Sequence, residues 1–309
     1  MNQRLTLPIV LLLTVPPLMW AGNAVVGRAV ADAIPPMLLN FLRWVIAFLI
    51  LLPLSWRVLK PSSSVWTNWR RYAVLGLLGV GCYNALMYLA LHTSTPLNVT
   101  LVGASMPMWM LATGAMFFNQ RVTRMQMAGA LLSMAGVLVV LSRGQFASLA
   151  NIEFSPGDFY MVLASIAWAF YSWMLFQPAG GQPKDAPEVR SDWAAFLMAQ
   201  MIFGLGWAGA LAGGEWAVVS ANASAPAISW SWPLAAALLY VALGPALLAY
   251  RCWGLGVQRV GPAIAGFFSN LTPLFAAVLS AAFLGELPQL YHAAAFVLIA
   301  GGIVVSSRR

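Results

Sequence analysis

The residues that could do chemistry in this chain are polar and aromatic side chains placed inside long apolar segments. Their amides, hydroxyls and ring tips could bind the ammonium and carboxylate of a solute, while aromatic walls stack on its apolar side chain. The alternative is that they pack helices together or form aromatic belts at a membrane interface. The predicted substrate-binding residues are Trp20, Asn23, Arg43, Tyr83, Asn84, Met87, Ser105, Trp109, Trp168, Tyr171, Tyr250, Phe267 and Asn270.

Spacing assigns several of these residues to shared helix faces. Trp20 and Asn23 lie three positions apart, and residues three or four apart share a face of an α-helix. Trp168 and Tyr171 repeat this spacing in the second half of the chain. The same rule places two further sets on one face each, namely Leu101, Ser105 and Trp109 in the first half, and Phe267, Leu271 and Phe275 in the second.

Two arginines lie inside the apolar segments. Arg43 is about seven residues into its segment, at a depth of about 10 Å if the helix rises about 1.5 Å per residue. It could snorkel outward, or it could line an aqueous vestibule and meet a substrate carboxylate. Arg251 lies near the end of its segment, where we expect it to snorkel toward the interface.

Acidic residues fall in loops or at segment ends, and none lies at a segment midpoint. Asp158 stands at the start of its segment, where we expect it to cap a helix N-terminus. Proton-coupled and cation-extruding carriers generally need a buried carboxylate as proton relay or cation partner. The sequence therefore predicts facilitated transport or exchange of a net-neutral substrate, and it ranks a pump for cationic drugs lower.

Motifs for catalysis are absent from the sequence. The chain has no His-Glu-x-x-His, no paired intramembrane aspartates and no Gly-x-Ser-x-Gly elbow, so we expect no enzyme and no catalytic residues. Cys82 and Cys252 fall in apolar stretches, and neither histidine has a partner at metal-ligand spacing. We therefore expect no metal and no cofactor. A channel is disfavoured because no Thr-Val-Gly-Tyr-Gly filter is present.

The elements that must position these residues are membrane-spanning helices. The 309 residues are 61% hydrophobic and 8% charged, with a mean hydropathy of +0.81, whereas a soluble domain is about 25% charged. A helix needs about 20 apolar residues to cross a bilayer. The sequence predicts an all-α polytopic membrane protein with ten spans, at residues 7–27, 36–54, 72–91, 97–118, 125–141, 157–176, 193–213, 233–255, 262–284 and 289–306.

Lysines and arginines are distributed unevenly between alternate loops. With a cytoplasmic N-terminus, 12 of the 16 fall on the inner side, two on the outer side and two within spans. Cytoplasmic loops of membrane proteins carry an excess of Lys and Arg, so we predict that both termini are cytoplasmic. The net charge of +8 is then a topology signal, and no nucleic-acid partner is expected.

An internal repeat relates the two halves of the chain in one fixed register without gaps. Five spans per half is an odd number, so the second copy must be inverted, and such repeats are typical of alternating-access transporters with a site near the membrane midplane. We predict two inverted five-helix repeats, 1–148 and 149–309, around a central cavity. The matching residues are Pro96, Pro107, Phe117, Ala128, Gly136 and Arg143 in the first half, and Pro262, Pro273, Phe283, Ala294, Gly302 and Arg309 in the second.

Helix breakers inside the spans are candidate hinges. A proline removes one backbone hydrogen bond and tends to kink a helix. Pro107 and Pro273 are repeat counterparts, which suits a pair that opens the two sides of the molecule alternately. Gly244 and Pro245 form a further predicted hinge. The alternative for each is a static kink needed for packing.

The order of these motifs resembles the drug/metabolite transporter superfamily, and within it the EamA-type ten-helix exporters. The resemblance covers nearly the whole chain, but Asn119-Gln120 stands where the second half has Gly285-Glu286, so a symmetric pair of acids is missing. The motifs that carry the resemblance are Leu89-Ala90-Leu91-His92-Thr93, Ser105-Met106-Pro107, Gly129-Ala130-Leu131-Leu132, Leu271-Thr272-Pro273-Leu274-Phe275, Phe283-Leu284-Gly285-Glu286 and Ala300-Gly301-Gly302.

The resemblance implies a helical bundle with a central cavity that moves amino acids, other metabolites or drugs. An aromatic-rich cavity without fixed acids looks most like the branch that exports aromatic and other neutral amino acids, and a broad-specificity drug/metabolite exporter is the alternative. Expected partners are a small-molecule substrate and the lipid bilayer, in a bacterial cytoplasmic (inner) membrane. Gly129 and Ser133 permit close helix contacts within the bundle or in a homo-oligomer.

Overall fold

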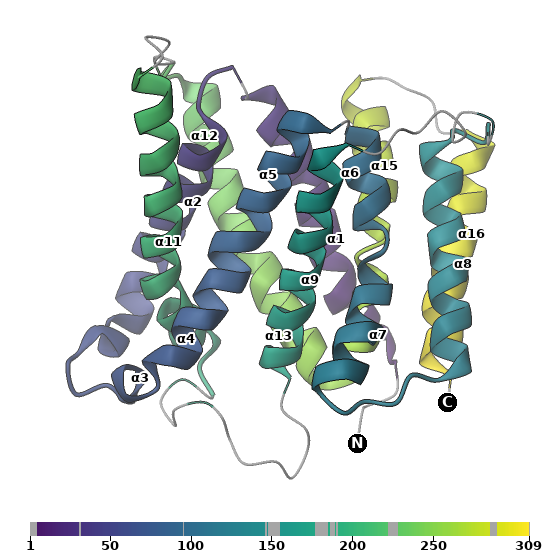
Figure 1. The fold of residues 1–309 in the computed structure, drawn as a ribbon, viewed down its shortest axis with the longest axis horizontal. Coiled ribbons are helices and arrows are strands. Elements are labelled where there is room, and N and C mark those ends of the chain that lie inside the picture. The colour runs from purple at the N-terminus through teal and green to yellow at the C-terminus, as the bar shows by residue number, and fades with distance from the viewer. Residues whose placement is uncertain are drawn as a thin grey trace.

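The fold is a bundle of helices that stand side by side in one layer-like array (Figure 1). The computed structural model describes the chain except residues 1–4, 31, 95, 146, 148–154, 177–184, 186–188, 190, 222–227, 285–288 and 309. Within the described residues, nine helices are long and apolar enough to cross a membrane. A tenth crossing, residues 69–93, is built from three consecutive helical pieces. The prediction of an all-α chain with ten spans is confirmed.

The bounds of the helices follow the predicted spans closely. The first half contains α1 (Leu7–Ala29), α2 (Pro36–Ser55), η1 (Trp56–Leu59), α3 (Ser64–Thr67), α4 (Trp69–Leu75), η2 (Gly76–Cys82), α5 (Tyr83–Thr93), α6 (Pro96–Gly103), α7 (Met106–Phe117) and α8 (Arg124–Leu141). The second half contains α9 (Pro156–Leu175), α11 (Trp193–Ala221), α12 (Trp232–Val241), η4 (Ala242–Leu248), α13 (Ala249–Val260), α14 (Pro262–Phe268), α15 (Leu271–Leu284) and α16 (Leu290–Ser307).

The register that pairs Pro107 with Pro273 in the sequence also pairs helix bounds. It maps both ends of α8 onto the ends of α16, and both ends of η2 onto the ends of η4. Both η2 and η4 are π-helical turns, so even a rare local geometry is repeated. The predicted boundary between the halves, at residues 148 and 149, lies outside the described residues. The helices of the two halves interleave, since α2 packs on α11 and α5 on α9.

The pairing of α8 with α16 displays the inversion directly. The two helices are repeat counterparts, and they run antiparallel beside each other at one edge of the bundle (Figure 1). A Cβ on Gly129 would lie 2.6 Å from the Gly302 carbonyl oxygen, and a Cβ on Gly136 would lie 2.9 Å from that of Ala295. These two contacts are exchanged by the repeat register. Small residues therefore let the counterpart helices approach as a two-fold axis requires.

Prolines explain why spans 4 and 9 are each broken into two helices. A proline has no N–H for the carbonyl four residues earlier, and its ring crowds that carbonyl. For Pro107 that residue is Gly103, where α6 ends, and for Pro273 it is Ser269, directly after α14. Each proline therefore sits in the first turn of the second piece, where it is well tolerated. For Pro245 the residue four positions earlier is Val241, and the π-helical η4 begins directly after it.

Acidic side chains hold helix ends together instead of lying at mid-span. Asp158 accepts a hydrogen bond from the Ser155 backbone N–H (2.8 Å) in a capping box at the start of α9. The N-cap is Ser155, so Asp158 stabilises the helix start from the third helical position and not as the predicted N-cap. It also accepts hydrogen bonds from Ser94 and from Asn98 (3.1 Å). Glu215 of α11 accepts from the backbone N–H of Met37 (3.1 Å) and so caps the N-terminus of α2.

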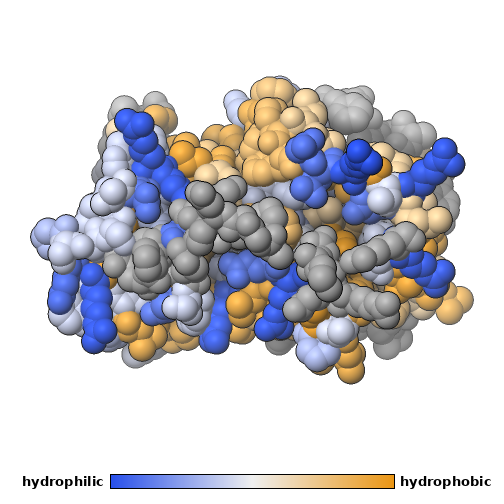
Figure 2. All heavy atoms as spheres, turned by 90° about the horizontal axis from the view of Figure 1, so that it is seen from below, coloured by the Kyte–Doolittle hydropathy of each residue, from blue (hydrophilic) through white to orange (hydrophobic). Residues whose placement is uncertain are grey.

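The start of α1 and the end of α16 lie at the same end of the bundle, the lower end in Figure 1. Figure 2 shows this end, where hydrophilic residues are spread among apolar ones. Cationic side chains here rest on aromatic rings, as Lys60 does 4.5 Å above Trp56 and Arg70 does 5.8 Å from Trp69. Arg71 forms an ion pair with Asp185 (2.7 Å). We call this the lower end of the molecule and the opposite one the upper end.

Candidate functional site

A central cavity of about 200 Å³ lies between the two halves. It is bounded by α1, α2, α5, α6, α9, α13 and the break between α14 and α15. The predicted site residues that line it are Trp20, Asn23, Arg43, Tyr83, Asn84, Met87, Trp168, Tyr250 and Asn270, together with the predicted hinge residue Pro273. Helices from both halves of the chain thus place most of the predicted substrate-binding residues around this one cavity.

Arg43 is the one cation in the described wall of this cavity. Its side chain is 2% exposed, so it does not snorkel, and it takes the second of the two predicted positions. Nη1 donates a hydrogen bond to Asn23 Oδ1 (3.4 Å), and the guanidinium lies 5.2 Å from the Trp44 ring. Nε has no hydrogen-bond partner among the described residues. A buried guanidinium without an anion is costly, so this group favours a ligand that carries a carboxylate.

Three further polar atoms of the wall are buried without a hydrogen-bond partner in the described part of the chain. They are Asn84 Nδ2, Ser269 Oγ and Asn270 Oδ1. The amide of Asn270 is held in place because its Nδ2 donates to Ser133 Oγ (2.9 Å) on α8. The unpaired set includes N–H donors, from Arg43 and Asn84, and oxygen acceptors. Donors suit a carboxylate and acceptors suit an ammonium group.

The rest of the wall is aromatic and apolar. Trp168 is its centre, with ring centroids 5.2 Å from Trp20, 5.1 Å from Tyr83 and 5.5 Å from Tyr250. Rings at these distances support one another in edge-to-face or tilted arrangements. Tyr250 is fixed further by the hydrogen bond that its hydroxyl donates to the Gly79 carbonyl in η2. These contacts make a preformed apolar surface beside the unpaired polar atoms.

Four predicted site residues do not line the central cavity. Trp109 Nε1 donates to Ser105 Oγ (2.9 Å), so these two satisfy each other. Phe267 is fully buried in the core, and Tyr171 lines a second cavity. Ser105 and Trp109 do share one helix face, as their four-residue spacing predicts, because the Trp109 backbone N–H also donates to the Ser105 carbonyl (3.2 Å). The cavity is lined by a different face of this span, with Thr100, Gly103 and Met106. Among the predicted hinges, Pro107, Gly244 and Pro245 also lie outside the cavity wall.

Several residues of the cavity wall were not predicted from the sequence. Ser269 precedes Asn270 in the break between α14 and α15, and Thr272 lies in the first turn of α15. Thr100, Met106 and Met161 complete the polar and sulfur-containing lining. Hydroxyls inside an apolar span look like ordinary helix-packing groups. The signal that could have found Ser269 and Thr272 is their position next to Pro273, because a proline-broken helix exposes the side chains at its break.

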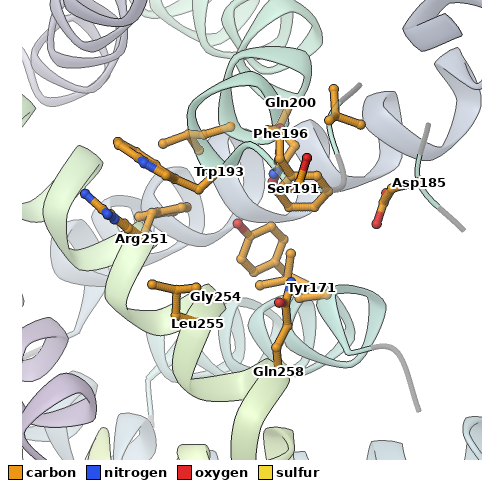
Figure 3. A pocket seen from close by; sticks show the side chains of 14 residues that line it. Tyr171, Asp185, Ser191, Trp193, Phe196, Gln200, Arg251, Gly254, Leu255 and Gln258 are labelled. Atoms are coloured by element: carbon orange, nitrogen blue, oxygen red, sulfur yellow. Dashed lines mark hydrogen bonds between the residues drawn. The ribbon is translucent and has the colours of Figure 1, made fainter. Parts of the chain in front are cut away.

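A second cavity, of about 280 Å³, opens toward the lower end (Figure 3). We call it the lower cavity. Tyr250 borders both cavities and packs on Tyr171 with ring centroids 5.9 Å apart. This aromatic pair therefore stands between the lower and the central cavity. The lining residues are Tyr171, Leu175, Asp185, Val189, Ser191, Trp193, Phe196, Leu197, Gln200, Tyr250, Arg251, Gly254, Leu255 and Gln258.

The geometry is that of two inverted repeats around a solute-sized cavity, and comparison with known proteins agrees. The EamA-like transporter family matches residues 7–142 and 155–308, one match in each half. The chain belongs to this family. As an EamA-like protein it is an integral, multi-pass membrane transporter, and the second match begins just before α9.

Individual relatives of this EamA-like transporter are distant but extend over most of its length. It is 26% identical to a probable amino-acid metabolite efflux pump of Salmonella typhimurium, over 93% of this chain and 90% of the relative. It is 23% identical to the aromatic amino acid exporter YddG of Ancylobacter novellus, over 94% and 93%. The inner membrane transporter YedA of Escherichia coli is also 23% identical, over 87% and 80%.

A solved crystal structure shares the fold of this EamA-like transporter. It matches with a TM-score of 0.70 and 22% sequence identity, and the match covers 96% of each chain. At this identity the likeness shows the fold alone.

Proposed function

We propose that this transporter exports neutral amino acids with apolar or aromatic side chains by alternating access. The observation that carries the proposal is the set of unpaired buried atoms in the central cavity, from Arg43, Asn84, Ser269 and Asn270. The carboxylate of the substrate would take the donors, its ammonium would take the acceptors, and its side chain would lie against Trp168. The names of the Salmonella and Ancylobacter relatives support the same substrate class.

The charge of the cavity argues against a cationic substrate. Its described lining contains Arg43 and no Asp or Glu. A proton relay or a partner for a cationic drug would need a buried carboxylate. We therefore infer facilitated transport or exchange that does not use a buried acid.

A broader metabolite exporter is the second candidate, and one observation favours it. Met87, Met106 and Met161 line the cavity, and methionine side chains adapt to ligands of different shape. The volume of about 200 Å³ argues for small solutes, because pockets for drug-sized ligands measure about 300–1,000 Å³.

We also propose that the lower end faces the cytoplasm, with both termini inside, in a bacterial inner membrane. Support comes from the arginines and lysines at this end and from the general excess of these residues in cytoplasmic loops. The inner membrane location named for YedA agrees with it.

Counterflow in liposomes tests the proposed function. Purified protein is reconstituted into vesicles loaded with one unlabelled amino acid, and uptake of the same labelled compound is measured for neutral, aromatic, basic and acidic members of a panel. We expect saturable counterflow for aromatic and other apolar amino acids, unchanged when the proton gradient is collapsed. No counterflow with any amino acid would favour the broader exporter, and a strict dependence on the proton gradient would contradict the mechanism.

A further inference from the structure

The lower cavity holds polar groups that the central site does not use. Gln200 of α11 is 1% exposed, and its Nε2 donates to the Phe196 carbonyl oxygen (3.1 Å). Its Oε1 has no hydrogen-bond partner among the described residues. An acceptor buried in this way is destabilising unless a donor reaches it. The cavity therefore offers an unfilled place for a donor such as an ammonium group.

A cation stands at the rim of the same cavity. The guanidinium of Arg251 lies against the indole of Trp193, 4.7 Å from the ring centroid (Figure 3). The structure gives Arg251 no ion pair within the described residues. Asp185, the one acid of the described lining, is held by Arg71 through Nε (2.7 Å) and Nη2 (3.2 Å). Within the described part of the chain, the guanidinium of Arg251 is therefore not neutralised by the one acid of the lining.

The chemistry of these groups repeats that of the central cavity on the other side of the aromatic pair. Among the described residues, both places combine an unpaired acceptor, a cation without an acidic partner and aromatic walls. This combination suits a zwitterion with an apolar side chain. In the lower cavity the aromatic walls are Tyr171 and Phe196. Tyr250 borders both cavities, so a solute in the lower cavity would be one aromatic layer away from the central one.

We propose that the lower cavity is a second binding site for the transported amino acid, which binds there before it passes the Tyr171–Tyr250 pair. The carboxylate lies at Arg251, the ammonium at Gln200 Oε1, and the side chain against Tyr171 and Phe196. This site rests on the proposed function, because its ligand is the substrate of the central cavity.

Two glycines provide reporters for the two cavities. A Cβ on Gly254 would meet nothing within 4 Å, and this residue lines the lower cavity. Gly103 lines the central cavity, where an added Cβ would meet only the flexible end of Met161 at 3.3 Å. Gly254→Cys and Gly103→Cys are each introduced into a protein in which Cys82 and Cys252 are replaced by alanine. The rate of modification by a small methanethiosulfonate reagent is then measured with and without L-phenylalanine.

We expect L-phenylalanine to protect both thiols. At ten times its dissociation constant it should slow each modification about tenfold. Gln200→Met or Arg251→Gln should abolish protection at residue 254 and leave protection at residue 103 unchanged. Arg259→Gln is the matched control, because Arg259 is on the same helix as Arg251 but outside the cavity lining, and it should change neither.

Three results would overturn the second site, and they differ in what they say about the proposed function. Protection at residue 103 alone leaves the central site standing and removes the lower one. Protection at neither residue contradicts the proposed function as well. If Asn270→Ala abolishes protection at residue 254 together with that at 103, the lower thiol reports a conformational change and not a bound ligand.

Discussion

The breaks in spans 4 and 9 are repeat counterparts that contribute opposite chemistry to one cavity. Residues 103, 104 and 106 of the first half correspond, in the repeat register, to residues 269, 270 and 272 of the second, and all six line the central cavity. In the first half they are Gly103, Ala104 and Met106, whereas in the second they are Ser269, Asn270 and Thr272.

The inverted repeat therefore preserves the helix break before a proline in each half, but not the side chains that line the cavity at that break. Each break lies before a proline and each opens side chains into the cavity. An amino acid has a polar end and an apolar end, so a symmetric lining would serve neither well. We infer that the break in span 9 faces the ammonium group and the break in span 4 faces the side chain.

The largest change in half-saturating concentration is expected from removing the positive charge of Arg43, which faces the carboxylate in the proposed binding mode. Arg43→Gln should raise the half-saturating concentration for L-phenylalanine counterflow by about 10- to 150-fold, because a hydrogen bond to a charged group contributes about 1.5–3 kcal/mol. Arg259→Gln controls for the loss of positive charge. An unchanged half-saturating concentration in Arg43→Gln would place the carboxylate elsewhere.

Asn270→Ala tests the polar break and should have the next largest effect. It removes an acceptor from the cavity and the partner of Ser133, so we expect an increase in half-saturating concentration of about 2- to 12-fold, the range for one neutral hydrogen bond. Thermal unfolding of the same variant separates lost binding from lost stability. A fall in stability with unchanged counterflow would make Asn270 a packing residue.

The hinge prediction concerns the feature that the two breaks share. Pro273→Ala should lower the transport rate more than it lowers protein abundance, because it restores a backbone hydrogen bond across the break. We expect the fall in rate to be a smaller factor than the rise in half-saturating concentration in Asn270→Ala. Pro107→Ala is the counterpart variant. Equal losses of rate and abundance in both would indicate static kinks.

The smallest effect is expected from Ser105→Ala. Ser105 is occupied by Trp109 and does not line the cavity, so we expect less than about a twofold change, within the range of an ordinary substitution away from a site. Uptake of labelled L-phenylalanine by reconstituted protein measures it. An effect as large as that of Asn270→Ala would indicate that Ser105 contacts the substrate, although it does not line the cavity in this structure.

The sequence could predict the spans because bilayer thickness sets the length of each apolar run and charge marks the loops between them. It could predict Asn270 as a lining residue of the cavity because amide side chains inside apolar spans are few. It could predict Trp20 and Trp168 because each lies three residues before a polar side chain on the same helix face. It could not place Ser105, because a four-residue spacing groups residues on one helix face without showing which face meets the cavity.

The lower cavity escaped prediction for a different physical reason. Gln200 and Arg251 belong to helices that are not neighbours in the chain, since α12 and η4 lie between them. Neither residue lies within a local pattern that points to the other. Only the folded bundle brings α11 and α13 to the walls of one cavity, which Tyr171 of α9 also lines.

Whether the central cavity binds a zwitterion is tested by the affinity of the purified transporter for three compounds that share one phenyl side chain. L-Phenylalanine has both charged ends, phenethylamine lacks the carboxylate, and 3-phenylpropionate lacks the ammonium group. We predict that L-phenylalanine binds at least about tenfold more tightly than either analogue, because each analogue leaves buried polar atoms unpaired. Equal or tighter binding of phenethylamine would contradict a cavity built for a zwitterion.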